Sequence, residues 1–356
     1  MIELDGSYGE GGGQILRTAL GLSIITQKPF RLKNIRQNRS EPGLKQQHVS
    51  SIKACAEFGN AIIVGNKIGS KQIEFVPRVI KNRQIEINIG TAGSIGLLFQ
   101  SVMLPLIFTN SEIKIKGGTD VKWSMPIDYV MNVIKPILEP YCEMKIICEK
   151  RGYYPRGGGE VIFKTVPKFK RIDFDNFEKF HQFIFGNPAL NISNFRKLMI
   201  IRGVSHASFD LQQNSVAERQ AKATELMLRQ HGIVEIERMY SKTESTGSGI
   251  LLYAVFENNK RIGADVIGEK KIKSEEIGRM CYEKLEKILR QKIVDEHMQD
   301  NLIPLLGLFG GKIKVGEITM HTKSNIKVCE EFLGVEYNIE NQSEANFISV
   351  FSSSTK

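Results

Sequence analysis

A succession of loop, apolar helix and short strand occurs three times along this chain, and it constrains the fold more than any other feature. The first copy covers residues 9–35, the second 90–118 and the third 294–319. In each copy a second helix and further strands follow, with those helices expected at 43–58, 127–140 and 324–333. Within 127–140, the apolar positions have the spacing of one buried helical face. The pattern predicts an α/β (α+β) fold in which a βαβαββ-type unit is repeated three times.

The third copy lies farther along the chain than a simple repeat would place it. Gln14 and Gln100 are 86 residues apart, whereas Gln100 and Asn301 are 201 apart, a surplus of 115 residues. That surplus has the size of a small domain. Residues 182–290 have an α/β pattern of their own, in the order βαβββα, which is typical of a thioredoxin-like topology although no CxxC motif accompanies it. We expect an inserted domain at 182–290 within a core formed by 1–181 plus 291–356.

Charge and composition narrow the class of protein. Lys plus Arg number 49 and Asp plus Glu 39, and the net charge of +10 favours polyanionic partners, although solvated surfaces also carry such a surplus. The longest apolar stretch, 95–108, is interrupted and too short to span a bilayer, and the acidic, glycine-rich N-terminus is unlike a signal peptide. Five scattered cysteines argue against a disulfide framework or a zinc site. We expect a cytoplasmic protein without membrane association.

Two glycine-rich loops precede the first two apolar helices, at 9–13 and 90–94. Glycine lets backbone N–H groups approach a phosphate closely, and a helix N-terminus favours the bound anion. Neither loop has the spacing of a dinucleotide-binding or P-loop motif. Glu10 would repel phosphate unless a divalent cation lay between them, and Arg17 could reach the same anion from one turn into the helix. The alternatives are a tight turn before a buried helix and an arginine on a solvated face.

A basic loop and single polar residues complete the candidates. Arg36 and Arg39 lie before the second helix, where a guanidinium can bind phosphate through two hydrogen bonds, although a run of charge is often only a solvated face. Gln100 interrupts an apolar helix, and its amide needs either a core partner or a base edge. His321 occupies the equivalent loop of the third copy, where it is either catalytic or structural. The loop RGYYPRGGGE at 151–160 suits RNA backbone and stacking contacts, or a simple hairpin.

These motifs resemble those of a known family, in the same order and over nearly the whole chain. The matching segments are LDGSYGEGGGQILRTALGLS, IRQNRSEPGLKQQH, GTAGSIGLLFQ, GGTD, RGYYPRGGGEV, GEK and HTKSNI. The chain is similar to the RNA 3′-terminal phosphate cyclases, in a type 1, archaeal-like form. The resemblance implies three copies of the fold of the C-terminal domain of translation initiation factor three, and a relation to enolpyruvate transferases.

The resemblance also implies an activity and its partners. Enzymes of this family use ATP to convert an RNA 3′-phosphate into a 2′,3′-cyclic phosphodiester, through a covalent histidine–AMP adduct and then RNA(3′)pp(5′)A. The expected partners are therefore RNA 3′-phosphate ends, ATP and a divalent metal, Mg²⁺ or Mn²⁺. A homodimer is compatible with the family.

Individual residues take their expected roles from the same resemblance. His321 matches the nucleophile, and Glu10 matches the carboxylate that holds the metal on the ATP phosphates. Residues around the phosphates and the RNA end correspond to Arg17, Arg36, Arg39 and Gln47. Nucleotide contacts correspond to Gln100, Pro126, His297, Met298, Gln299, Asp300 and Asn301. The last five read HMQDN where bacterial members have YLADQ, so base stacking is expected to differ, and the residues before His321 also depart from the family pattern.

Two other functions occur on this fold. Cyclase-like RNA-binding proteins assist ribosome assembly without catalysis and lack the nucleophile, which His321 argues against. An enolpyruvate-type transferase is disfavoured by the cyclase motifs. A cyclase alone would retain acid-labile AMP after incubation with α-labelled ATP. Because no matched nucleotide residue falls within 182–290, we expect the inserted domain to be dispensable for histidine adenylation.

Overall fold

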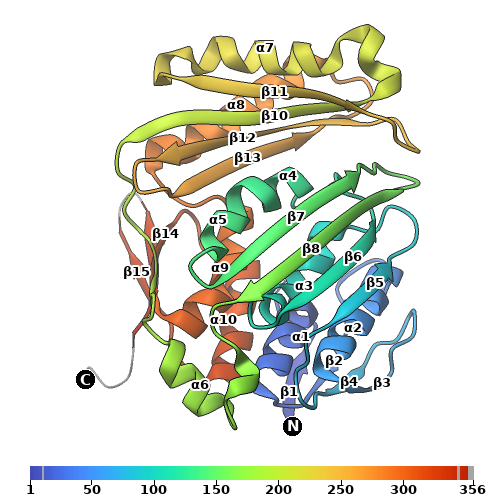
Figure 1. Cartoon of the computed structure of the whole chain (residues 1–356), viewed down its shortest axis with the longest axis vertical. Helices are drawn as coiled ribbons and strands as arrows, with labels where there is room; N and C mark the ends of the chain where they lie inside the picture. Colours follow the sequence, from blue (N-terminus) through green and yellow to red (C-terminus); the bar gives the residue numbers. More distant parts are fainter. Residues whose placement is uncertain (10–11, 343–344, 352–356) are drawn as a thin grey trace.

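The structure is a computed structural model, and it describes residues 1–9, 12–342 and 345–351 (Figure 1). It has the mixed α/β fold expected from the sequence. Within these residues the chain forms four four-stranded sheets with helices packed against them. No helix in the described ranges is long and apolar enough to cross a membrane.

Three of the sheets in the described part of the chain share one strand order. In each, the first strand pairs parallel with the second, the second antiparallel with the fourth, and the fourth antiparallel with the third. The strands are β1 (Ile2–Asp5), β2 (Phe30–Lys33), β3 (Ile62–Val64) and β4 (Ile73–Val76); β5 (Gln84–Asn88), β6 (Ser111–Gly117), β7 (Cys142–Lys150) and β8 (Gly159–Pro167); and β9 (Leu190–Ile192), β14 (Gly311–Val315), β15 (Asn338–Asn341) and β16 (Asn346–Val350).

Apolar helices make the crossovers that parallel strands require. They are α1 (Gln14–Thr26), α3 (Ile95–Ile107) and α9 (Glu296–Phe309), and almost every residue in them is buried. A helix that is apolar on all sides is stable only inside a core. Gly21 lets α1 approach α3 closely, since a Cβ there would lie 3.3 Å from the carbonyl oxygen of Ser101.

The second helices pack around this central group. They are α2 (Gln46–Gly59), α10 (Met320–Leu333), and α4 (Ile127–Tyr129), which continues through a π-helical turn at Val130–Ile134 into α5 (Lys135–Leu138). Pro136, which has no N–H to donate within the helix, lies just after the π-helical turn. The helices expected at 43–58, 127–140 and 324–333 are therefore present.

The structure corrects one correspondence between the copies. Helix α1 begins at Gln14 and α3 at Ile95, 81 residues later, and β2 and β6 begin at Phe30 and Ser111, also 81 residues apart. Gln14 therefore corresponds to Ile95 and not to Gln100. The glutamine spacing of 86 residues was misleading because Gln100 lies in the second turn of its helix.

The fourth sheet lies at one end of the molecule, uppermost in Figure 1. Its order is β11 (Val234–Ser241), β10 (Leu198–Ser208), β12 (Ser248–Phe256) and β13 (Arg261–Ile267). Helices α7 (Val216–Leu228) and α8 (Ser274–Gln291) pack against it and against each other. The elements follow one another as βαβββα, as the sequence pattern predicted.

The sequence placed the start of this region too early. Helix α6 (Phe177–Ile184) packs on α9, and β9 pairs with β14 in the third sheet. Residues 182–192, which we had assigned to the inserted domain, therefore pack with the third sheet. The pairing was invisible in the sequence because a strand of three residues is too short to show an alternating pattern.

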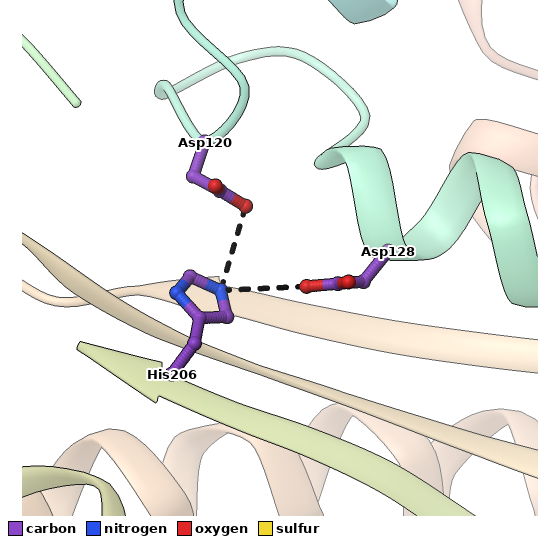
Figure 2. A group of neighbouring side chains, drawn as sticks. All are labelled: Asp120, Asp128 and His206. Carbon is purple, nitrogen blue, oxygen red and sulfur yellow. Dashed lines mark ion pairs between the residues drawn. The ribbon is translucent and has the colours of Figure 1, made fainter. Parts of the chain in front are cut away.

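Buried charged side chains join the fourth sheet to the second. Arg151 follows β7 and donates through Nη2 to both carboxylate oxygens of Asp128, at 2.9 and 2.7 Å, and through Nη1 to Asp120 at 3.1 Å. His206 of β10 lies between the same carboxylates, with Nε2 at 3.4 Å from Asp120 and 3.8 Å from Asp128 (Figure 2). All four side chains are buried. Loss of one partner would leave a buried charge uncompensated.

Tyr153 fixes the orientation of this histidine. Its hydroxyl oxygen lies 2.7 Å from Nδ1 of His206, and burial raises the pKa of Tyr153 well above its usual range, so the phenol stays protonated and donates. Burial and the positive charge of Arg151 lower the pKa of His206 to about 3. The neutral ring therefore carries its hydrogen on Nε2, directed at the two carboxylates.

Replacing Arg151 tests how strongly this cluster holds the sheets together. Because Arg151→Met leaves two buried carboxylates without their partner, we expect the free energy of unfolding to fall by about 3–5 kcal/mol, measured by urea denaturation. The matched control is the neighbouring Lys150→Met, whose side chain is 63% exposed and pairs with Glu160. That substitution should cost less than about 1 kcal/mol. Equal losses for the two variants would contradict the assignment.

Candidate functional site

The glycine-rich loop, the basic loop and His321 meet at one place. A Cβ built on Gly12 would lie 3.4 Å from Nη2 of Arg39 and 3.8 Å from Cε1 of His321. His321 lies in the first turn of α10, whose N-cap Thr319 accepts a hydrogen bond from the N–H of Thr322. The sequence placed His321 in a loop, and the structure moves it onto the helix N-terminus, where the backbone dipole favours an anion.

Gly13 packs against two further polar side chains. A Cβ there would lie 2.5 Å from Nε2 of His48 and 2.9 Å from Nη1 of Arg17, so a larger residue would collide with both. Nδ1 of His48 accepts a hydrogen bond from the N–H of Lys45 at 3.0 Å, at the start of α2. Burial, with the positive charges of Arg17, Arg36 and Lys45, lowers the pKa of His48 to about 3. The neutral ring therefore presents Nε2–H to the glycine-rich loop.

The second glycine-rich loop joins the same region through Gln47. Its Oε1 accepts a hydrogen bond from the N–H of Ser94 at 3.1 Å, and Ser94 in turn caps α3 by accepting from Leu97. The 151–158 loop packs on the other side, since a Cβ on Gly157 would lie 2.3 Å from the carbonyl oxygen of Thr91. The loops that follow β1, β2, β5 and β7 thus form one connected surface.

Four expected residues line a small cavity between α1, α3 and α9. They are Arg17, Gln100, Asp300 and Asn301. Nε of Arg17 and Oε1 of Gln100 are buried without a hydrogen-bond partner among the described atoms. Buried polar atoms are normally paired, so an orphaned donor and an orphaned acceptor on one cavity indicate a polar ligand. Arg17 is buried, so the solvated-face interpretation of this residue is wrong.

Burial shifts the pKa values of the two ionisable side chains that line this cavity. Burial lowers the pKa of Arg17 to about 10, which leaves the guanidinium charged at neutral pH. Burial raises the pKa of Asp300 to about 6, although the charge of His321 and a hydrogen bond from Thr322 act in the opposite direction. Oγ1 of Thr322 donates to Asp300 at 3.2 Å. The cavity therefore holds a cation and a carboxylate that ionises only with difficulty.

Asn325 of α10 connects α1 and α9 beside the cavity, and no role was expected for it from the sequence. Its Oδ1 accepts from Gln14 at 3.2 Å and from Thr18 at 2.7 Å, and its Nδ2 donates to the carbonyl oxygen of Asp300 at 3.0 Å. It lies one turn after His321 on α10, and this i, i+4 spacing was the available signal.

The 297–301 segment divides its contacts between the cavity and the protein interior. Met298 is fully buried, and Gln299 donates to the Glu317 carbonyl at 3.1 Å and to Thr322 at 2.7 Å. Asn301 donates to the carbonyl of His297 at 2.7 Å. Asp300 and Asn301 are the members of this segment that line the cavity.

His297 has its partner in the fourth sheet. Its Nε2 lies 3.0 Å from Oδ1 of Asp265 on β13. Burial opposes the charged form, but the charge and hydrogen bond of Asp265 prevail and raise the pKa of His297. Asp295 caps α9 and also accepts from the N–H of Gly263 on β13 at 3.1 Å. The region that we expected to be dispensable therefore holds the first turn of α9.

Arg36 and Pro126 have local structural roles. Nη1 of Arg36 donates to the carbonyl oxygens of Glu41 at 2.7 Å and Gly43 at 3.1 Å, so this arginine closes the basic loop. Pro126 is the N-cap residue of α4. It follows Met125, whose sulfur lies 3.3 Å from Nδ2 of Asn301.

Two groups of residues were considered as metal ligands. Glu10, the expected ligand, lies outside the described residues. Donor atoms of Asp120, Asp128 and His206 lie within 4.8 Å of one another, as the distances between metal ligands require. The guanidinium of Arg151 pairs with both carboxylates, and a cation bound there would face its positive charge. We therefore assign this cluster to the contact between sheets.

Comparison with known proteins shows the family to which the chain belongs. A family model described as RNA 3′-terminal phosphate cyclase matches residues 8–339. The chain is 42% identical over 353 residues to a curated RNA 3′-terminal phosphate cyclase of Saccharolobus solfataricus, covering 98% of each chain. It is 40% identical over 345 residues to a protein of the same name from Pyrococcus furiosus, covering 96% of this chain and 95% of the relative. The chain belongs to the RNA 3′-terminal phosphate cyclase family.

Proposed function

We propose that this protein converts RNA 3′-terminal phosphates into 2′,3′-cyclic phosphodiesters at the expense of ATP, with His321 as the nucleophile. The observation that carries the proposal is the meeting of His321, Arg39 and the glycine-rich loop at Gly12. Around this point lie a nucleophile, a guanidinium and close-packed backbone amides, which a nucleotidyl transfer requires together.

In the first step a neutral imidazole nitrogen of His321 attacks the α-phosphorus of ATP. A nitrogen–phosphorus bond forms, the bond from the α-phosphorus to the bridging oxygen breaks, and pyrophosphate leaves with the electron pair. Arg17 and Arg39 stabilise the negative charge that develops on the phosphates. A divalent cation held by Glu10 would supply further charge stabilisation at the same phosphates.

The remaining two steps return the histidine to its starting state. An oxygen of the RNA 3′-phosphate attacks the phosphorus of the adduct, the bond to His321 breaks, and RNA(3′)pp(5′)A forms. The neighbouring 2′-OH then loses its proton and attacks the 3′-phosphorus, and AMP leaves. Because that attack is intramolecular, correct positioning of the RNA end supplies much of the acceleration.

The small cavity between α1, α3 and α9, about 20 Å³ in volume, has room for one polar group of the nucleotide or for a water molecule. The orphaned Nε of Arg17 is a charged donor for an anion or a ring nitrogen, and the orphaned Oε1 of Gln100 is an acceptor for an exocyclic amine. Asn301 contacts the sulfur of Met125, the residue before Pro126, which supports a place for both Asn301 and Pro126 beside the adenosine.

The strand order of the sheets supports a second proposal, about the units from which the fold is built. We infer that the three equivalent sheets are repeats of the translation initiation factor three C-terminal fold, and that residues 198–291 form a thioredoxin-like domain inserted between β9 and α9. The shared strand order and the βαβββα succession support this division. The homodimer and the cytoplasmic location stay predictions.

Removal of the nucleophile is the first test. His321→Ala should lower the covalent AMP formed from α-labelled ATP by at least about a thousand-fold, the scale expected when a reacting group is deleted. The control is His231→Ala, because His231 pairs with Glu286 away from the site. Circular dichroism checks that both variants fold. Acid-labile AMP retained by folded His321→Ala protein would place the nucleophile elsewhere.

Metal dependence tests the role of Glu10. EDTA should stop adenylation of the parent protein, and Glu10→Gln should raise the Mg²⁺ or Mn²⁺ concentration for half-maximal adenylation by about ten-fold or more. Glu3→Gln serves as the control, since Glu3 pairs with Arg31 and Lys33 on the sheet. A metal titration identical to that of the parent would refute the role of Glu10.

Recognition of the terminal phosphate is tested at Arg39. Arg39→Ala should weaken binding of an RNA oligonucleotide with a 3′-phosphate by about ten-fold or more, and binding of the same strand with a 3′-hydroxyl by much less. The control Arg78→Ala removes an exposed arginine that follows β4, at the opposite end of the strands from the loop after β2 that holds Arg39. Equal losses of affinity for both RNA ends would show that Arg39 makes only a nonspecific contact with the RNA backbone.

A further inference from the structure

Two aromatic side chains stand almost fully in solvent. Trp123 is 92% exposed and Tyr154 is 77% exposed, more than any other large apolar side chain in the described residues. Trp123 is also the single tryptophan of the chain. Large aromatic side chains are usually well buried, so two neighbouring ones left in water indicate a binding surface.

The two residues come from adjoining loops. Trp123 lies between β6 and α4, and Tyr154 lies between β7 and β8. A backbone bridge joins Asp120 to Tyr153, and the carbonyl oxygen of Gly152 accepts from the N–H groups of both Thr119 and Asp120. Both aromatic side chains are therefore tied to one backbone framework.

Trp123 is held in an unusual conformation. Its φ is +60°, in the left-handed region that a bulky residue adopts only at a cost in energy. Oγ of Ser124 donates to the carbonyl oxygen of Val121 at 2.9 Å, and Lys122 forms an ion pair with Glu269 at 2.7 Å. The surrounding contacts thus maintain the turn that exposes the indole.

This surface continues from the nucleotide cavity. Met125, two residues after Trp123, contacts Asn301 of the cavity through its sulfur, and its carbonyl oxygen would lie 2.3 Å from a Cβ on Gly96 at the start of α3. On the other side, the loop of Tyr154 packs on Thr91 through Gly157. The loops of Trp123 and Tyr154 are therefore connected, through the 90–94 loop and Asn301, to the elements around His321.

The charge around the aromatic pair is positive. Lys270, Lys271 and Lys273 are exposed in the segment that follows Glu269, and Arg156 is exposed beside Tyr154. Arg202 and Arg219 of the same fourth-sheet region are paired with Glu235 and Glu275 and add little to it. Exposed aromatic side chains among lysines and arginines are the composition of surfaces that bind single-stranded nucleic acid.

We propose that Trp123 and Tyr154 form a stacking platform for the bases that precede the terminal nucleotide of a single-stranded RNA substrate. The lysines of the 269–273 segment contact the phosphates of the same strand. This inference rests on the proposed function, because it takes the RNA end to lie at His321. It adds a site that binds the body of the strand and not its phosphorylated end.

The single tryptophan gives a direct measurement of the contact. Titration of the parent protein with a single-stranded oligoribonucleotide should change the emission of Trp123, because a base stacked on the indole quenches it and excludes water. ATP alone should leave the emission unchanged. Emission that stays constant while RNA binding is demonstrated by anisotropy of a labelled strand would overturn the proposal.

Kinetics with long and short substrates provide the second measurement. Trp123→Ala should raise KM for a 3′-phosphorylated oligoribonucleotide of about ten residues by about five-fold or more, and leave KM for a nucleoside 3′-phosphate near that of the parent. Trp123→Phe keeps a ring and should restore most of the loss. The control Ile233→Ala removes a 63% exposed apolar side chain before β11, away from these loops.

The two measurements separate the platform from the reaction. A parent protein that changes its emission with RNA but forms no cyclic phosphate would refute the proposed function and support the platform. A parent protein that cyclises, with Trp123→Ala unchanged on the long substrate, would refute the platform and leave the function intact. Equal loss on long and short substrates would show an effect on the nucleotide site instead.

Discussion

The lack of space for a side chain at Gly13 is the constraint on which the rest of the site depends. His48 and Arg17 approach this position so closely that a Cβ would lie within 3 Å of both. The first turns of α1, α2 and α10 approach one another here because Gly12 and Gly13 have no side chains to accommodate. Their positive helix ends then act together on whatever anion lies at the loop.

Of the basic side chains around Gly13, some stay charged and one is neutral. Arg17 stays charged in spite of its burial, whereas His48, which lies among arginine and lysine side chains, is held neutral. A second imidazolium there would repel the guanidinium groups and gain nothing from water. The site therefore presents guanidinium groups and a neutral N–H donor, an arrangement suited to a phosphate chain and to a nucleophilic imidazole that must itself be unprotonated.

The fourth sheet lies at one end of the molecule, but its residues bond to the elements that carry the candidate site. Asp265 holds His297, Gly263 donates to the cap of α9, and the cluster of Asp120, Asp128, Arg151 and His206 fixes the sheet to the loops after β6 and β7. Those loops also carry Trp123 and Tyr154. A movement of this sheet would therefore displace both the first turn of α9 and the proposed RNA surface.

The sequence by itself determined the features that are written in local patterns. Helical and strand periodicity gave the succession of elements in the three copies and the βαβββα region, and the spacing of glycines gave the two loops at helix N-termini. The family resemblance brought His321, Glu10 and the arginines together as candidates. The predicted elements and loops are present because hydrophobic periodicity and backbone requirements act over a few residues, whereas the roles of the candidate site residues stay predictions.

Only the tertiary structure decided the features that depend on distant contacts. The pairing of β9 with β14, the burial of Arg17 and the bond between His297 and Asp265 each depend on segments that no local pattern connects. The exposure of Trp123 is of the same kind, because a tryptophan in a short loop is buried or left in water according to what packs over it. Which side chains contact one another depends on how the core packs, so these contacts can be identified only in the folded structure.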